Sequence, residues 1–188
     1  MTPPILGIWA SGAQPAANAT SFESIATVSV GSGGQSEIDF TSISSNYNHL
    51  QIRGIAKDSN STTQQLRMRF NGDTGSNYTL HHILGDGASA SAGSGTNTTH
   101  IQMVYCVSLN SYTAFGGAVI DILDYKNTNK YKTVRALAGY DRNGSDSYIS
   151  FNSGLWMNTN AITSIKLFLT GANFSQYSHF ALYGIKEA

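Results

Sequence analysis

Residues 66–77 read LRMRFNGDTGSN, and this stretch decides the fold class. Its first five residues alternate strictly, so Leu66, Met68 and Phe70 share one face of an extended chain and the two arginines share the other. A period of two predicts a strand with one buried and one hydrated face. The Asn, Gly, Asp and Ser residues that follow predict a turn.

The same unit of strand and turn recurs along the chain. QSEIDF at 35–40 alternates in the same way, and Asn143-Gly144 is a hairpin signal. YTLHHILG at 78–85 fits either a strand or one helical turn, whereas the glycine-rich residues 85–99 predict a mobile loop. We predict further strands at residues 21–30, 48–56, 100–109, 117–125, 132–140, 148–156, 161–170 and 179–185.

Many short strands without a long amphipathic helix predict two antiparallel sheets packed face to face. The expected fold is therefore all-β, an antiparallel β-sandwich of jelly-roll type. The chain has 188 residues, which suits one such domain at residues 21–188.

Residues 1–20 form a distinct segment before this domain, and we predict an extended N-terminal arm. Gly12 and the residues after it read as a flexible connector to the domain. A short apolar segment of this kind is typical of a docking peptide, and the alternative is that it packs on its own domain as a first strand. The predicted partner-binding residues are Pro3, Pro4, Ile5, Leu6, Ile8 and Trp9.

The composition points to a surface built for assembly. Ser, Thr, Asn and Gly account for 75 of the 188 residues, whereas charged residues make up 12% and the net charge is zero. That is about half the usual charged share, and the chain lacks the basic field that nucleic acid requires. Hydroxyl and amide groups cost less to remove from water than charges do. The alternative interpretation is the neutral, hydrogen-bonding exterior of a monomer.

The sequence also argues against a membrane protein and a disulfide framework. It has no apolar stretch near the roughly 20 residues that a membrane helix needs. The N-terminus does not resemble a signal peptide, so we expect assembly inside a cell. Cys106 is the only cysteine, and its apolar neighbours predict a buried thiol.

We find no catalytic or metal-binding constellation in the sequence, and we expect a non-enzymatic protein without a cofactor. His81 and His82 are adjacent, so a strand would point them to opposite faces. Asp73 and Asp86 resemble fragments of calcium loops but are better explained as turn caps. The tyrosines near turns fit protein interfaces and the core, with glycan stacking as the alternative.

Three strings in the sequence are specific: RFNGDTGSNY (69–78), DYKNTNKYKT (124–133) and SGLWMNT (153–159). Together with FALYGIK at 180–186, which recurs more broadly in phage proteins, they resemble small virion structural proteins of tailed bacteriophages, including cyanophages. The resemblance covers nearly the whole chain from residue 21.

This resemblance implies a component of a phage particle. The expected role is a capsid decoration (cement) protein, a homotrimer that binds the major capsid protein on the outer shell and stabilises contacts between capsomers. The alternative is a tail fibre or receptor-binding protein that recognises host surface glycan, and an enzyme such as a capsule depolymerase is the third class. No nucleic acid or membrane partner is expected.

Overall fold

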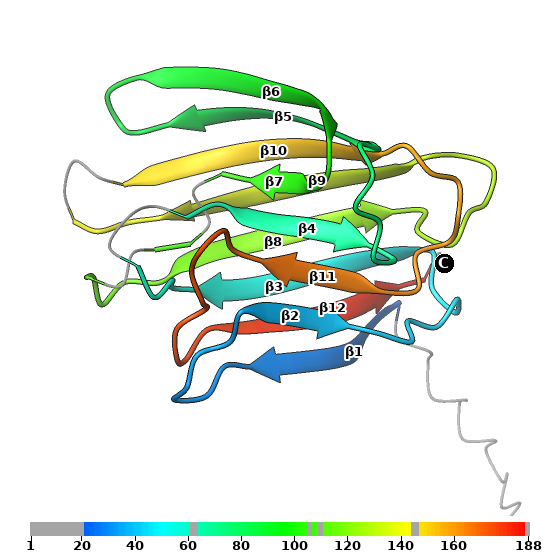
Figure 1. Cartoon of the computed structure of the whole chain (residues 1–188), viewed down its shortest axis with the longest axis horizontal. Helices are drawn as coiled ribbons and strands as arrows, with labels where there is room; N and C mark the ends of the chain where they lie inside the picture. Colours follow the sequence, from blue (N-terminus) through cyan, green and yellow to red (C-terminus); the bar gives the residue numbers. More distant parts are fainter. Residues whose placement is uncertain (1–20, 61–63, 105–106, 109–110, 144–146, 187–188) are drawn as a thin grey trace, which may run out of the picture.

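The fold consists of two antiparallel β-sheets that face each other (Figure 1). The computed structural model describes residues 21–60, 64–104, 107–108, 111–143 and 147–186, and these form twelve strands and no helix. The predicted all-β architecture of two antiparallel sheets is thereby confirmed. The predicted arm at residues 1–20 lies outside the described residues.

The larger sheet has eight strands and the smaller sheet has four. The larger sheet consists, in spatial order, of β1 (Phe22–Ser29), β12 (His179–Ile185), β3 (His49–Ala56), β8 (Gly116–Leu123), β9 (Lys132–Tyr140), β10 (Tyr148–Trp156), β5 (Tyr78–Gly85) and β6 (Ala90–Thr98). The smaller sheet consists of β2 (Glu37–Phe40), β11 (Ile165–Phe168), β4 (Leu66–Phe70) and β7 (Ile101–Met103).

The core lies between the two sheets. Leu66, Met68 and Phe70 of β4 are fully buried there, as their alternation predicts, and they face apolar residues of the larger sheet such as Ile52 and Ile120. Each such side chain contributes about 1.5–3 kcal/mol when it leaves water completely. Hydrophobic burial at a period of two therefore fixes which face of β4 points inward.

The β5–β6 hairpin corrects the prediction of a loop at residues 85–99. Figure 1 shows it extending past the edge of the smaller sheet, and β6 pairs with β5 from Gly85 opposite Ala90 to Tyr78 opposite Thr98. The backbone ladder forms although β6 has only small or polar side chains, because the ready-made edge of β5 overrides weak strand propensity. The pairing also shows that residues 78–85 form a strand and not a helical turn.

The predicted strand at 100–109 is shorter, because polar side chains draw the chain out of the smaller sheet after Met103. Asn152 Oδ1 accepts a hydrogen bond from the backbone N–H of Val104 at 3.1 Å, and Ser150 Oγ donates to the Val104 carbonyl at 2.6 Å. A Cβ at Gly154 would lie 2.6 Å from Ile101, so glycine permits this close approach to β10. Cys106 lies outside the described residues.

Candidate functional site

Two of the sequence strings that carry the phage resemblance meet at one end of the sandwich. The Asp73 carboxylate, in the turn after β4, accepts a hydrogen bond from Trp156 Nε1 at 2.7 Å and others from Asn77 and the Gly75 N–H. Burial alone would raise the pKa of Asp73, but these hydrogen bonds outweigh it and hold the pKa below its ordinary value. The predicted role of Asp73 as a turn cap is confirmed.

Asn71 joins the same turn to the segment before β11. Its Oδ1 accepts hydrogen bonds from the N–H groups of Thr163 and Ser164 at 2.8 and 3.1 Å, and its Nδ2 donates to the Ala161 carbonyl at 2.8 Å. These bonds use the Ala161 carbonyl and the N–H groups of Thr163 and Ser164, which a neighbouring strand would otherwise bind. The strand predicted at 161–170 is therefore shorter and covers Ile165–Phe168.

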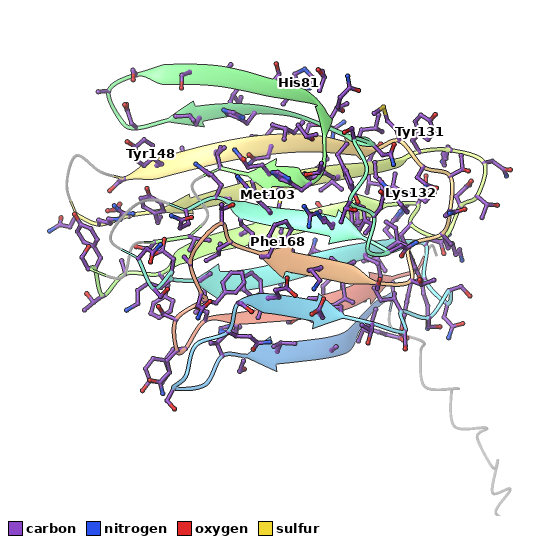
Figure 2. The ribbon with its side chains drawn as sticks, in the orientation of Figure 1. His81, Met103, Tyr131, Lys132, Tyr148 and Phe168 are labelled. Carbon is purple, nitrogen blue, oxygen red and sulfur yellow. The ribbon has the colours of Figure 1, made fainter. Side chains whose placement is uncertain are left out.

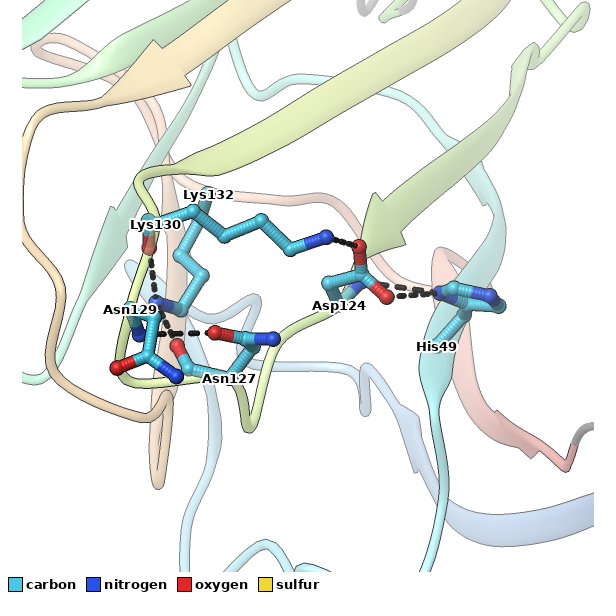
Figure 3. Close-up of polar contacts among 6 residues, drawn as sticks. All are labelled: His49, Asp124, Asn127, Asn129, Lys130 and Lys132. Atoms are coloured by element: carbon cyan, nitrogen blue, oxygen red, sulfur yellow. Dashed lines mark hydrogen bonds and ion pairs between the residues drawn. The ribbon is translucent and has the colours of Figure 1, made fainter.

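The third string forms the loop between β8 and β9 around a buried lysine (Figure 3). Lys132 is fully buried, and its Nζ donates to the carbonyls of Asn127 at 2.5 Å, Lys130 at 2.9 Å and Thr159 at 3.0 Å. Burial lowers the pKa of Lys132, with partial compensation from Asp124. All three ammonium donors are used, so this lysine fastens two loops together.

Asp124 closes the other side of this loop. Its carboxylate pairs with Lys130, which holds the pKa of Asp124 below its ordinary value, and its backbone N–H donates to His49 Nδ1 at 2.9 Å. Hydrogen bonds therefore join the string at 153–159 to each of the other two, through Trp156 to Asp73 and through Thr159 to Lys132. We interpret this end of the molecule as scaffold, and the candidate functional site lies elsewhere.

The two outer faces of the sandwich differ sharply in chemistry. On the smaller sheet, Lys166 pairs with Glu37 and lies 3.6 Å from Asp39, and the arginines of β4 share this face. Figure 2 shows Phe168 on the same sheet, and its ring lies 4.7 Å from the guanidinium of Arg69. This face has the hydrated, charged character of an ordinary protein surface.

The outer face of the larger sheet contains a row of exposed apolar side chains instead. Exposed apolar side chains lie directly opposite one another on β8, β9, β10, β5 and β6, and we call this row the apolar ladder. Leu137 is 54% exposed and Ile83 is 60% exposed. The register defines the ladder as Val119, Leu137, Phe151, Ile83 and Ala92. Contiguous exposed apolar rows of this kind mark binding surfaces.

Beside the ladder lies a shallow groove of about 990 Å³, which we call the glycine groove. Its floor is the cross-strand pair Gly117 and Gly139, and Ile55 and Ile149 flank that pair in the same row. Val119 and Leu137 of the ladder also line it. The groove floor is therefore apolar, whereas charged residues such as Arg53, Asp86 and Asp141 also line the groove.

A second, smaller hollow lies at the other end of the ladder. Phe151 and Ile83 line it together with His81 and Gly93, and its volume is about 480 Å³. A Cβ at Gly93 would lie 2.6 Å from the His82 ring, so a larger residue there would require this ring to move. Both hollows belong to one face, which gives a partner two depressions to fill.

A polar row borders the ladder on the side away from the groove. Asp121 of β8 lies opposite Arg135 of β9, and its carboxylate accepts a hydrogen bond from Gln51 Nε2 at 2.7 Å. Arg53 Nε donates to Gln51 Oε1 at 2.8 Å. This arrangement of an apolar centre with a hydrogen-bonded polar border is typical of a protein interface.

The sequence reasoning located none of this surface. The six predicted partner-binding residues, from Pro3 to Trp9, lie outside the described residues. Val119, Leu137 and Phe151 fall in predicted strands, but Ile83 falls in the segment that fits a strand or a helical turn and Ala92 in the predicted loop, and the sequence assigns none of them to an exposed face. A signal was present in KTVRALAGY and YISFNSGLW, because both alternating sets of these strands include large apolar residues.

The histidines do not belong to a metal-binding cluster among the described residues. His81 is exposed and His82 is partly buried on the opposite face, as predicted for a strand. Within the described part of the chain, His, Cys, Asp and Glu do not gather in threes at a spacing that could hold a metal ion. The same residues include no helix long and apolar enough to cross a membrane.

The lowered pKa of His100 predicts that the free energy of unfolding depends on pH. Burial lowers its pKa to about 4, with further lowering from Arg67 and Arg69. An unfolded histidine titrates near 6.5, so between about pH 6.5 and 4 the unfolded chain binds a proton that the folded chain does not. The free energy of unfolding should therefore fall as the pH falls through this window.

Denaturant unfolding of the wild type and of His100→Gln at several pH values tests this expectation. The variant should lose stability less steeply between about pH 6.5 and 4. The pKa of His82 is also lowered by burial, so some slope should remain. Equal slopes for the two proteins would show that His100 does not titrate as described.

Comparisons with protein-family models, with curated proteins and with solved structures find no match to this chain.

Proposed function

We propose that this protein is a non-enzymatic structural protein of a bacteriophage particle and decorates the capsid as a cement protein. In this proposal it assembles in the host cytoplasm, binds the major capsid protein on the outer shell as a homotrimer, and stabilises contacts between capsomers. The resemblance of the three strings supports the particle assignment. The jelly-roll relationship belongs to the proposal too, and the two facing antiparallel sheets support it at the level of architecture.

The observation that carries the proposal is the contrast between the two outer faces. The outer face of the smaller sheet is charged, whereas the larger sheet exposes the apolar ladder, with charged side chains in Arg53 at one end of the ladder and in the adjacent row of Asp121 and Arg135. Water-exposed apolar area gains about 25 cal/mol per Å² when a partner covers it. A flat face of many strands suits a broad partner surface such as a shell, and repetition over many copies would strengthen modest individual contacts.

We place the shell contact at the hollow formed by Ile83 and Phe151. These two side chains lie opposite each other on β5 and β10, and they are 60% and 43% exposed. Apolar anchors at the centre of an interface contribute most of the binding energy. The predicted contacts of residues 3–9 with a partner remain a further part of this proposal.

One observation favours the tail-fibre alternative. Tyr112 and Tyr140 flank the Arg142 guanidinium at 4.5 and 4.0 Å, and Tyr148 packs edge-on against Tyr140. Tyr112 is exposed whereas Tyr140 is buried, so Tyr112 would supply the ring that stacks on a sugar in a receptor-binding protein. Tyr131 lies at the other end of the sandwich from Tyr148 and would not share that site (Figure 2).

Co-sedimentation of the purified protein with separated phage heads and tails distinguishes the two roles. We expect saturable binding to heads that lack this protein, and none to tails. Binding to tails alone would contradict the decoration role and direct attention to the tyrosine cluster. Binding to neither would contradict both placements.

A further inference from the structure

Gly117 at the floor of the glycine groove has no local structural reason to be glycine. A Cβ at this position would meet no atom within 4 Å, and its backbone does not adopt the left-handed conformation that favours glycine. Gly139 beside it differs, because a Cβ there would lie 2.5 Å from the Tyr148 carbonyl oxygen. Glycine weakens a strand interior, and there it often marks a bulge, a tight bend or the close approach of another chain segment or ligand. The pairing of β8 with β3 and β9 is in regular register at Gly117, which leaves close approach.

The chain enters the sandwich on the face that contains this groove. Phe22 is the first residue of β1, and its ring stacks on Tyr183 of β12 with centroids 4.7 Å apart. The Arg53 guanidinium lies 5.2 Å from the Phe22 ring. Tyr183 and Arg53 both line the groove. Phe22 therefore lies beside residues that line the near end of the groove. The Ser21 carbonyl accepts a hydrogen bond from the Lys186 N–H at 2.9 Å, so Ser21 continues away from the groove floor and an arm that reaches the floor turns back over the sheet.

The distance from this entry point to the groove floor is within reach of the preceding chain. Phe22 of β1 is aligned, through Ile185 of β12, with His49 of β3. Gly117 of β8, which is three strands from β1, is paired with Ile55, six residues after His49 on β3. Three strand spacings and six residues along the strand give about 14 Å by 20 Å, or about 25 Å in a straight line. The eleven residues 10–20 can span up to about 36–40 Å when extended.

We propose that residues 5–9, ILGIW, occupy the glycine groove of their own chain. The segment supplies Ile5, Leu6, Ile8 and Trp9, and the groove supplies an apolar lining without a side chain at its floor. A groove of about 990 Å³ is at the upper end of the size range for sites that bury a ligand of several rings. The short tether makes the segment's local concentration millimolar, which favours its own groove over that of another copy.

This contact gives the free subunit a way to remain soluble before assembly. The arm and the groove are each apolar, and each would otherwise expose that surface to water. The Ile83–Phe151 hollow stays open for a partner while the groove is filled. The proposal concerns the isolated chain, and it holds whether or not the protein decorates a capsid.

Acrylamide quenching of tryptophan fluorescence tests the contact in the full-length protein. The chain has two tryptophans, and Trp156 is only 1% exposed, so quenching reports chiefly on Trp9. Ile149 and Ile83 provide a matched pair, because both are 60% exposed on the same sheet face but only Ile149 lines the groove. We expect weak quenching in the wild type and in Ile83→Glu, and severalfold stronger quenching in Ile149→Glu.

Strong quenching in the wild type would show a free arm and overturn the proposal. Weak quenching that Ile149→Glu leaves unchanged would place Trp9 elsewhere and overturn it too. Thermal unfolding of both variants checks that they fold, since each substitution is on an exposed strand position.

Photo-crosslinking identifies the occupant directly. p-Benzoylphenylalanine at position 137 should link to residues 5–9 within single chains at low protein concentration. Links found only in two-chain products would assign the groove to the arm of a neighbouring copy and overturn the single-chain contact. Links to other parts of the chain, with none to residues 5–9, would exclude the arm as occupant.

Discussion

Replacing Lys132 with methionine is expected to lower the free energy of unfolding by about 2–4 kcal/mol. Methionine keeps most of the buried stem but removes the ammonium that donates to the carbonyls of Asn127, Lys130 and Thr159. Hydrogen bonds from a charged donor contribute about 1.5–3 kcal/mol each, and relief from burying the charge offsets part of the loss. Urea or guanidinium unfolding measures the difference.

Lys130→Met is the matched control in the same loop. Lys130 is exposed and pairs with Asp124 at the surface, where an ion pair contributes at most about 1 kcal/mol. Its substitution should therefore cost much less than that of Lys132. Equal stability losses for the two variants would show that the buried ammonium does not hold the two loops together.

Phe151→Glu is expected to weaken binding to phage heads about a hundredfold or more, because truncating a central aromatic costs about 2 kcal/mol and a buried carboxylate adds its desolvation. Phe151 is the middle residue of the apolar ladder and lines the smaller hollow. Titration of heads with labelled protein measures the affinity. This prediction rests on the proposed decoration role.

Tyr131→Glu is the control for that titration. Tyr131 is also a half-exposed aromatic residue, but it lies in the loop between β8 and β9 at one end of the sandwich (Figure 2). Its substitution should leave the affinity within about threefold, as for a residue outside an interface. Weakening by Tyr131→Glu but not by Phe151→Glu would move the contact from the sheet face to the loops.

The sequence predicts strands best where one face is buried and the other is charged. Leu66, Met68 and Phe70 alternate with arginines, and all three lie in the core. The pattern predicts poorly where side chains do not determine the pairing. The small residues of β6 form a strand only because β5 offers an edge, and that edge is a tertiary feature.

The sequence does not reveal the exposed apolar face, because several inward-facing residues of β9 and β10 are small. The inward positions of β9 and β10 include Ala136, Ala138 and Ser150, whereas the large residues Leu137 and Phe151 point outward. A reading that assigns large apolar residues to the interior therefore inverts these strands. Only the register, which aligns Leu137 with Phe151 and Ile83, shows that they form one surface.

The most conspicuous strings proved to be structural. Asp73 and Trp156 are far apart in the sequence but hydrogen-bonded at 2.7 Å, and Lys132 binds the carbonyl of Thr159 across two loops. Such pairings depend on how the strands are ordered in space, which periodicity does not encode. Composition shows that the chain has few charges, but it does not show where they lie, and the structure places Arg53 opposite Val119 at one end of the ladder and Asp121 opposite Arg135 in the adjacent row.

Cryo-electron microscopy of intact phage particles tests the central claim, that the outer face of the eight-stranded sheet is the docking surface. The account predicts density for this sandwich on the capsid, with Phe151 and Ile83 against the shell and the charged face of the smaller sheet toward solvent. Density with the apolar ladder facing solvent, or density on the tail alone, would contradict it.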